Sequence, residues 1–171
     1  ETDVRVRLCL DGEGDADIVC EDQFLCHMVE SLAKYASFDV EVEAEGDNSH
    51  HLVEDVALTL GLALREALGD RPVQRIGWSV VPMDDALVTV SVDLIDRAYA
   101  DIECPDALYH HFLRSFAMSS EITLHTVVNR GFDDHHIIEA CFKALGLSLK
   151  RAATPREKIL STKDEPSVEK G

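Results

Sequence analysis

The chain has 171 residues, 46% of them hydrophobic, which suffices for one ordinary domain or two small halves packed together. Its formal net charge of -17 disfavours nucleic acid and anionic membrane surfaces as partners, because their phosphates would be repelled. No apolar run approaches the length of a membrane span, and the N-terminus lacks a signal-peptide pattern. Five scattered cysteines without a CxxC pair predict reduced thiols in a cytoplasmic protein.

The predicted elements alternate between strands and helices. Residues 2–10 alternate apolar and polar side chains, which is the period of a half-buried strand, and residues 17–20 could pair back on them as a hairpin. The apolar spacing predicts helices over 24–36 and 50–68, with a strand over 38–44 between them. The second half repeats this order, with strands over 76–81, 86–94 and 98–103, a helix over 107–118, a strand over 122–128 and a final helix over 134–152.

This order predicts an α+β two-layer sandwich with an internal duplication. Each half is a ββαβα unit, allowing for one strand more or less, with its helices on one face of a mainly antiparallel sheet. We expect a single domain over residues 1–171, made of two similar halves at about 1–72 and 73–153 and a polar C-terminal tail at 154–171.

One short segment occurs twice. HHLVE at 50–54 recurs as HHIIE at 135–139, and each copy opens a predicted helix, which indicates a duplicated fold. Histidine and glutamate one turn apart share a helix face, and imidazole with carboxylate favours Mn, Fe, Co, Ni or Zn. Adjacent helical residues diverge by about 100°, so both histidines of a pair cannot easily bind one ion. We therefore expect two metal centres, each drawing ligands from more than one segment.

Four further histidines accompany the two pairs. Each half carries a lone histidine upstream of its pair, His27 in the first half and His125 in the second. The pair His110-His111 has Arg114 in place of a downstream carboxylate and sits mid-helix, so we interpret it as structural or surface. A single HHxxE could equally be the polar first turn of a helix, but two copies at corresponding places favour metal binding.

Several motifs spread along the chain match one known family. They are FLCHM at 24–28, the two HHxxE helices, PMDDAL at 82–87, VSVDLIDRAY at 90–99 and STK at 161–163. On these motifs the chain resembles imidazoleglycerol-phosphate dehydratase, an enzyme of histidine biosynthesis, in the divergent short-loop type found in archaea. The resemblance implies a fold of the ribosomal protein S5 domain 2-like kind.

The resemblance also implies a manganese-dependent hydro-lyase. The family converts D-erythro-imidazole glycerol phosphate to imidazole acetol phosphate through a metal-bound imidazolate. Two Mn²⁺ ions per active site act as orienting template and Lewis acids. Carried over residue by residue, the metal ligands are His27, His50, His51, Glu54, His125, His135, His136 and Glu139.

Other residues of the resemblance would act on the proton and the phosphate. Removal of a proton from carbon requires a carboxylate within reach, and the candidates are Glu1, Asp84 and Glu139. A phosphate dianion in so acidic a chain needs a local cationic cluster. The phosphate-binding positions of the family fall on Arg75, Arg97, Ser161 and Lys163.

One position departs from the family pattern beside a proposed ligand. Cys26 stands where the family has aspartate, which removes a carboxylate partner of His27.

The family further implies a homo-oligomer, a cage of 24 subunits built from trimers, with metal sites at subunit interfaces and a small phosphorylated imidazole as substrate. Two alternatives remain open. The first is another dinuclear metal enzyme, such as a hydrolase of small phosphate esters, which would not require the phosphate-binding set. The second is a metal-binding relative that has lost turnover.

Overall fold

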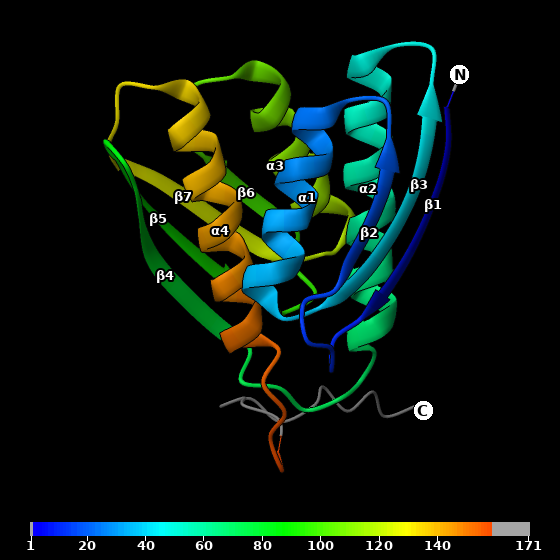
Figure 1. Cartoon of the computed structure of the whole chain (residues 1–171). Coiled ribbons are helices and arrows are strands. Elements are labelled where there is room, and N and C mark those ends of the chain that lie inside the picture. The colour runs from blue at the N-terminus through cyan, green and yellow to red at the C-terminus, as the bar shows by residue number, and fades with distance from the viewer. Residues whose placement is uncertain (1, 159–171) are drawn as a thin grey trace, which may run out of the picture.

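The computed structural model describes residues 2–158, which form two sheets and four helices (Figure 1). Their order follows the predicted alternation closely. In chain order the elements are β1 (Thr2–Cys9), β2 (Ala16–Cys20), α1 (Gln23–Ala36), β3 (Asp39–Gly46), α2 (Ser49–Leu68), β4 (Ile76–Met83), β5 (Ala86–Asp93), β6 (Tyr99–Ile102), α3 (Ala107–Ser119), β7 (Thr123–Arg130) and α4 (Asp134–Ala152).

The first sheet has the strand order β1-β3-β2. β1 pairs antiparallel with β3, whereas β2 pairs parallel with β3. The expected hairpin between residues 2–10 and 17–20 is therefore wrong. Helix α1 carries the chain from the end of β2 back to the start of β3, and such a crossover makes the two strands parallel.

The second sheet repeats this arrangement and adds one strand. Its order is β4-β5-β7-β6, in which β5 and β7 are antiparallel and β6 and β7 are parallel. The set β5-β7-β6 thus corresponds to β1-β3-β2, which confirms the predicted duplication. Both sheets are mixed, and β4, antiparallel to β5, has no counterpart among the described strands of the first half.

The helices of both halves lie between the two sheets (Figure 1). Each half is a two-layer sandwich, as predicted, and the halves meet through their helices. Each helix packs against a helix of the other half: α1 packs against α4, and α2 packs against α3. The strands bury one face accordingly, as on β3, where Val40 and Val42 are buried while Glu41 and Glu43 are exposed.

Two glycines allow the paired helices to approach closely. A Cβ on Gly61 of α2 would lie 2.0 Å from Ser119 Oγ of α3, and a Cβ on Gly146 of α4 would lie 2.6 Å from the Leu32 carbonyl oxygen of α1. Each glycine follows the first histidine of its helix by eleven residues, so the close approach belongs to the repeat. The separation of each helix pair is therefore set by the repeated sequence.

Cys20 at the end of β2 and Cys26 in α1 are joined by a disulfide. Their Cα atoms lie 6.4 Å apart, within bridging range. The expectation of free thiols throughout is therefore wrong for this pair, because the turn from β2 into α1 brings the two side chains together. The bond ties α1 to β2 one residue before His27.

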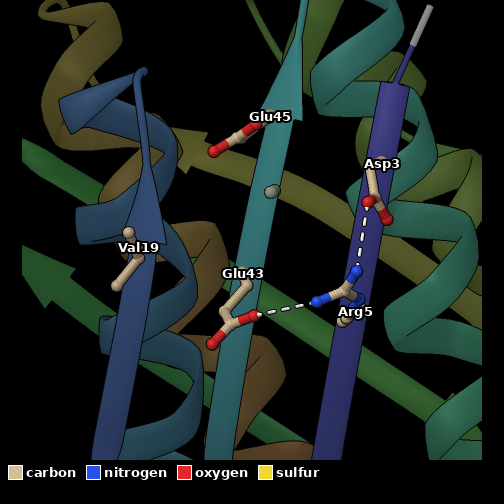
Figure 2. A pocket seen from close by; sticks show the side chains of 6 residues that line it. Asp3, Arg5, Val19, Glu43 and Glu45 are labelled. Atoms are coloured by element: carbon tan, nitrogen blue, oxygen red, sulfur yellow. Dashed lines mark hydrogen bonds and ion pairs between the residues drawn. The ribbon is translucent and has the colours of Figure 1, made fainter.

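The outer faces of the two sheets differ in character. On the first sheet, Asp3, Arg5 and Glu43 border a charged hollow of about 290 Å³, with the Arg5 guanidinium 3.3 Å from Asp3 and 3.6 Å from Glu43 (Figure 2). On the second sheet, β4 exposes apolar side chains, including Trp78 at 58% and Val80. Over residues 2–158, no helix has the length and apolar character needed to cross a bilayer.

Candidate active site

The four helices begin at the same end of the fold (Figure 1). Each starts behind a side chain that accepts hydrogen bonds from the first N–H groups of the helix, which fixes where the helix begins. The histidines of interest follow within the first two turns, so they gather at this end. The capping residues are Asp22 for α1, Asn48 for α2, Asp106 for α3 and Asp133 for α4.

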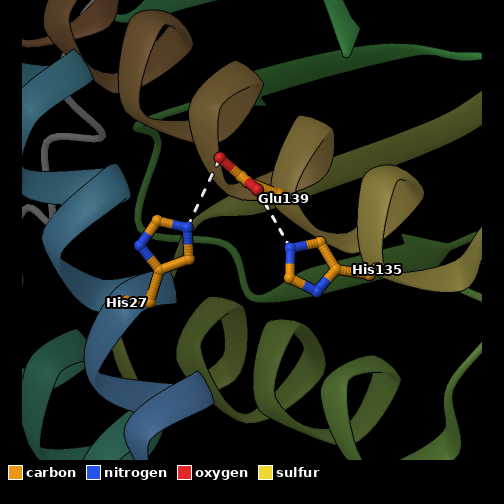
Figure 3. A group of neighbouring side chains, drawn as sticks. All are labelled: His27, His135 and Glu139. Atoms are coloured by element: carbon orange, nitrogen blue, oxygen red, sulfur yellow. Dashed lines mark ion pairs between the residues drawn. The ribbon is translucent and has the colours of Figure 1, made fainter. Parts of the chain in front are cut away.

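His27, His135 and Glu139 form the first cluster (Figure 3). The Glu139 carboxylate lies between the two rings, with Oε1 3.4 Å from His27 Nε2 and Oε2 3.3 Å from His135 Nε2. His27 comes from α1 and the other two come from α4, so the cluster joins the halves of the chain. One potential ligand atom from each residue lies within 4.8 Å of the others.

His50, Glu54 and His111 form the second cluster, within the same 4.8 Å limit. His50 and Glu54 come from α2 and His111 comes from α3, which repeats the composition of the first cluster. Glu54 Oε1 lies 3.0 Å from His111 Nε2. That nitrogen is buried. The three side chains are therefore close enough together to hold one cation.

The second cluster contains His111 and does not contain His125. His111, which we interpreted as structural or surface, lies in the second cluster. His125 lies on the outer face of β7, where its neighbours are Asp101 at 3.7 Å and Tyr99, and it joins neither cluster. A signal for His111 was present in the sequence, because both His27 and His111 follow their helix caps by five residues.

The second histidine of each pair, His51 or His136, stands apart from its own cluster. This agrees with the expected divergence of adjacent helical residues. His51 is 58% exposed, and its Nδ1 lies 3.8 Å from Asp47. The His136 ring is 28% exposed, and its Nδ1 lies 2.6 Å from Asp85 Oδ1.

Glu139 is the most buried member of either cluster, at 6% exposed. Burial is the largest influence on its pKa and raises it, but the contacts with Lys143 and His27 outweigh burial, so the pKa is lowered overall. The Lys143 ammonium lies 2.8 Å from Oε1, one helical turn along α4. In the second cluster, contact with His111 likewise lowers the pKa of Glu54. Both carboxylates are therefore held in the charged form that binds a cation.

Two aspartates in the turn between β4 and β5 contact His136. Asp84 has a φ of 48°, a left-handed conformation that aspartate tolerates, and its Oδ2 lies 3.4 Å from His136 Nε2. Asp85 accepts backbone N–H groups from Phe132 and Asp133 at 2.5 and 3.2 Å. These contacts lower the pKa of Asp85 to about 2, and the hydrogen bond with His136 has a larger effect than those from the two backbone N–H groups. Asp84, a predicted proton-transfer residue, thus lies beside the N-terminal end of α4.

The described members of the phosphate-binding set lie at the other end. Arg75 stands just before β4 and forms a two-pronged ion pair with Asp93, at 2.6 Å from Nε and 2.9 Å from Nη2. Arg75 also lines a cavity of about 810 Å³ at the C-terminal end of α2. That helix has 20 residues and spans about 30 Å, and its first turn carries His50. Arg97 precedes β6 and is exposed at this same end of the sheet, where its carbonyl accepts a hydrogen bond from Thr123.

Three predicted residues fall outside the described part of the chain. They are Glu1, assigned to proton transfer, and Ser161 and Lys163, assigned to phosphate.

Comparison with known proteins decides the family. The model of the family described as imidazoleglycerol-phosphate dehydratase matches residues 21–149. The chain belongs to the imidazoleglycerol-phosphate dehydratase family. It is 43% identical to the imidazoleglycerol-phosphate dehydratase of Bacillus licheniformis, covering 95% of the chain and 93% of that protein. It is 47% identical to that of Methanothermobacter thermautotrophicus, covering 89% of the chain and 85% of that protein.

Solved dehydratase structures share the fold. The structure from Pyrococcus furiosus superposes with a TM-score of 0.84 at 38% identity, covering 95% of this chain and 94% of that one. The structure from Staphylococcus aureus gives 0.82 at 28% identity, covering 91% and 95%. Similar dehydratases thus come from both bacteria and archaea, and the archaeal character of the short loops stays a prediction.

Proposed function

We propose that this chain dehydrates imidazole glycerol phosphate with two Mn²⁺ ions, one held at each cluster. Membership of the dehydratase family makes the chain a hydro-lyase of histidine biosynthesis. The observation that carries the metal proposal is the pair of clusters with the same composition of two imidazoles and one carboxylate. Nitrogen and oxygen ligands without thiolate suit Mn²⁺. When bound, the ions would orient the substrate and stabilise negative charge on its ring.

The proposed ligand set differs from the expected one at a single histidine. His111 replaces His125, because His111 lies beside Glu54 whereas His125 is on the outer face of the second sheet. The ligands within one chain are then His27, His135 and Glu139 for the first ion and His50, Glu54 and His111 for the second.

Each cluster offers three ligands, whereas Mn²⁺ prefers about six. The substrate ring and further imidazoles would complete each site. His51 and His136 are suited to this, since both stand apart from the cluster of their own chain. We propose that each serves a cluster of a neighbouring subunit, so that the metal sites lie at interfaces.

The position of the arginines supports assembly independently. The substrate is a small molecule, yet Arg75 and the His50 cluster lie near opposite ends of a helix about 30 Å long. One chain cannot hold both the phosphate and the imidazole of one substrate, so the arginines would serve a site on another copy. The exposed apolar side chains of β4, among them Ile76, Trp78 and Val80, offer a surface for such a copy. A cage of 24 subunits is the assembly we propose.

Proton transfer falls to carboxylates at the metal end. Asp84 has a largely exposed side chain and lies beside His136 Nε2, where it can reach a substrate held next to the ring. Glu139 is buried between two imidazoles and is better placed to hold the ion than to carry protons. Glu1 is the second candidate for proton transfer. The cytoplasmic location inferred from the cysteines stays a prediction.

Metal reconstitution tests the proposal. The purified chain is stripped with a chelator, reloaded with Mn²⁺ and supplied with imidazole glycerol phosphate. We expect two Mn²⁺ per chain and formation of imidazole acetol phosphate only after reloading. Release of inorganic phosphate would favour the phosphate-ester hydrolase instead, and Mn²⁺ uptake without either product would favour a relative that has lost turnover.

A further inference from the structure

The two halves differ in the surroundings of the second histidine of each pair, His51 in the first half and His136 in the second. His136 in the second half meets the turn between β4 and β5, and within residues 2–158 no strand of the first half corresponds to β4. Among residues 2–158, the carboxylate beside His51, its equivalent in the repeat, is that of Asp47. The described surroundings of the two histidines therefore differ.

Asp85 in that turn is itself held in place. Its Oδ2 accepts the backbone N–H groups of Phe132 and Asp133, the two residues before α4. Its Oδ1 lies 2.6 Å from His136 Nδ1. A carboxylate only accepts hydrogen bonds, so Nδ1 carries the proton and the lone pair of a neutral ring lies on Nε2. Nε2 is then the metal-binding nitrogen, and the ring is oriented before any ion arrives.

The first half has a weaker arrangement. Asp47 Oδ1 lies 3.8 Å from His51 Nδ1, beyond hydrogen-bond distance, and His51 is more exposed than His136. The two carboxylates also differ in origin. Asp47 lies on the same segment as His51, four residues before it, whereas Asp85 reaches His136 from another strand pair.

We propose that Asp85 is a positioning residue that fixes His136 for metal binding, so that the two Mn²⁺ positions are unequal and the one served by His136 binds the ion more tightly. The inference rests on the proposed function, since it assumes that both second histidines bind metal. Partners of this kind on a ligating histidine are worth about 10- to 100-fold in metal affinity.

The substitution Asp85→Asn isolates this role. The asparagine oxygen can still accept the N–H groups of Phe132 and Asp133, so the start of α4 keeps its anchor. Its amide nitrogen would face His136 Nδ1 and favour the opposite tautomer, with the proton on Nε2. The ring would then present a proton where it should present a lone pair. The matched control is Asp47→Asn, which makes the same chemical change beside His51.

The experiment titrates Mn²⁺ into the metal-free full chain and its variants and follows free Mn²⁺ by its magnetic resonance signal. We expect two classes of site in the unaltered chain. Asp85→Asn should weaken the tighter class by about 10- to 100-fold and leave the other unchanged, while Asp47→Asn should change neither class by more than about threefold. In a His136→Ala background, adding Asp85→Asn should have no further effect, because the carboxylate acts through that ring.

Three results would overturn the inference. They are equal binding by Asp85→Asn and the unaltered chain, equal weakening by both asparagine variants, or failure of Asp85→Asn to fold, which would make Asp85 a folding residue. An unaltered chain that binds no Mn²⁺ would instead contradict the proposed function. The two failures are therefore distinguishable.

Discussion

His27 and His111 occupy equivalent positions in the two halves, each five residues after the aspartate that caps its helix. Each faces the HHxxE helix of the opposite half, because α1 packs on α4 and α2 packs on α3. The duplication therefore does not give one metal cluster per half. It gives two clusters that are each shared between the halves, so neither half alone would present a complete set of three ligands.

Alanine variants of His111 and His125 show which of the two histidines binds metal. We expect His111→Ala to lower bound Mn²⁺ from two ions to one per chain and to reduce turnover by more than about 100-fold, since a lost ligand should cost more than a lost partner of a ligand. His125→Ala should retain both ions, because that ring lies on the outer face of β7. Elemental analysis and the dehydration assay measure both effects. A variant pair with the opposite pattern would restore the original assignment.

Glu139→Gln keeps the size of the side chain and removes its charge. We expect loss of Mn²⁺ from the first cluster and loss of turnover, because a buried neutral amide cannot replace the carboxylate between His27 and His135. Glu66→Gln on the exposed face of α2 is the matched control and should change neither quantity. Full turnover with unchanged metal content in Glu139→Gln would remove Glu139 from the ligand set.

Gly146→Ala tests whether helix separation controls the first cluster. In an open helix this change stabilises by about 1 kcal/mol. Here the new Cβ would lie 2.6 Å from the Leu32 carbonyl oxygen, so we expect a destabilisation of about 1–3 kcal/mol and weaker Mn²⁺ binding. Urea unfolding and Mn²⁺ titration measure the two effects. A gain in stability with normal metal binding would show that the helices can move apart freely.

The contact between Asp85 and His136 predicts a pH window for the metal-free chain. Because the pKa of Asp85 is lowered in the folded chain, its contribution to folding stability is complete above pH 3.8 and is lost as the pH falls through about 2. Because the pKa of His136 is raised in the folded chain, its contribution to folding stability is complete below pH 6.5 and is lost as the pH rises through the pKa of the folded state. The stability difference between the unaltered chain and Asp85→Asn should therefore be largest between pH 3.8 and 6.5. Urea unfolding across pH checks this, and a difference that grows above the window would contradict it.

The sequence predicted the elements and the repeated pairs well because both are local. Helical spacing places His135 and Glu139 on one face whatever the helix packs against. The partner of a strand is not local, which is why the alternation of residues 17–20 did not reveal that β2 pairs with β3. His111 was missed for a similar reason, since its carboxylate partner Glu54 lies on another helix. The sequence signal for His111 is its spacing of five residues from the helix cap, which matches that of His27.

The turn at Asp84 and Asp85 shows the same limit. The motif PMDDAL is a family feature of the sequence, but the contact between Asp85 and His136 depends on the packing of the β4–β5 turn against the start of α4. The direction in which His51 and His136 point also depends on the whole fold.

Anomalous diffraction at the manganese edge, from crystals of the reconstituted chain, tests the central claim most directly. We expect two peaks per chain, one between His27, His135 and Glu139 and one between His50, Glu54 and His111, each with a further imidazole from a neighbouring subunit. Peaks beside His125, or a single peak per chain, would contradict the account.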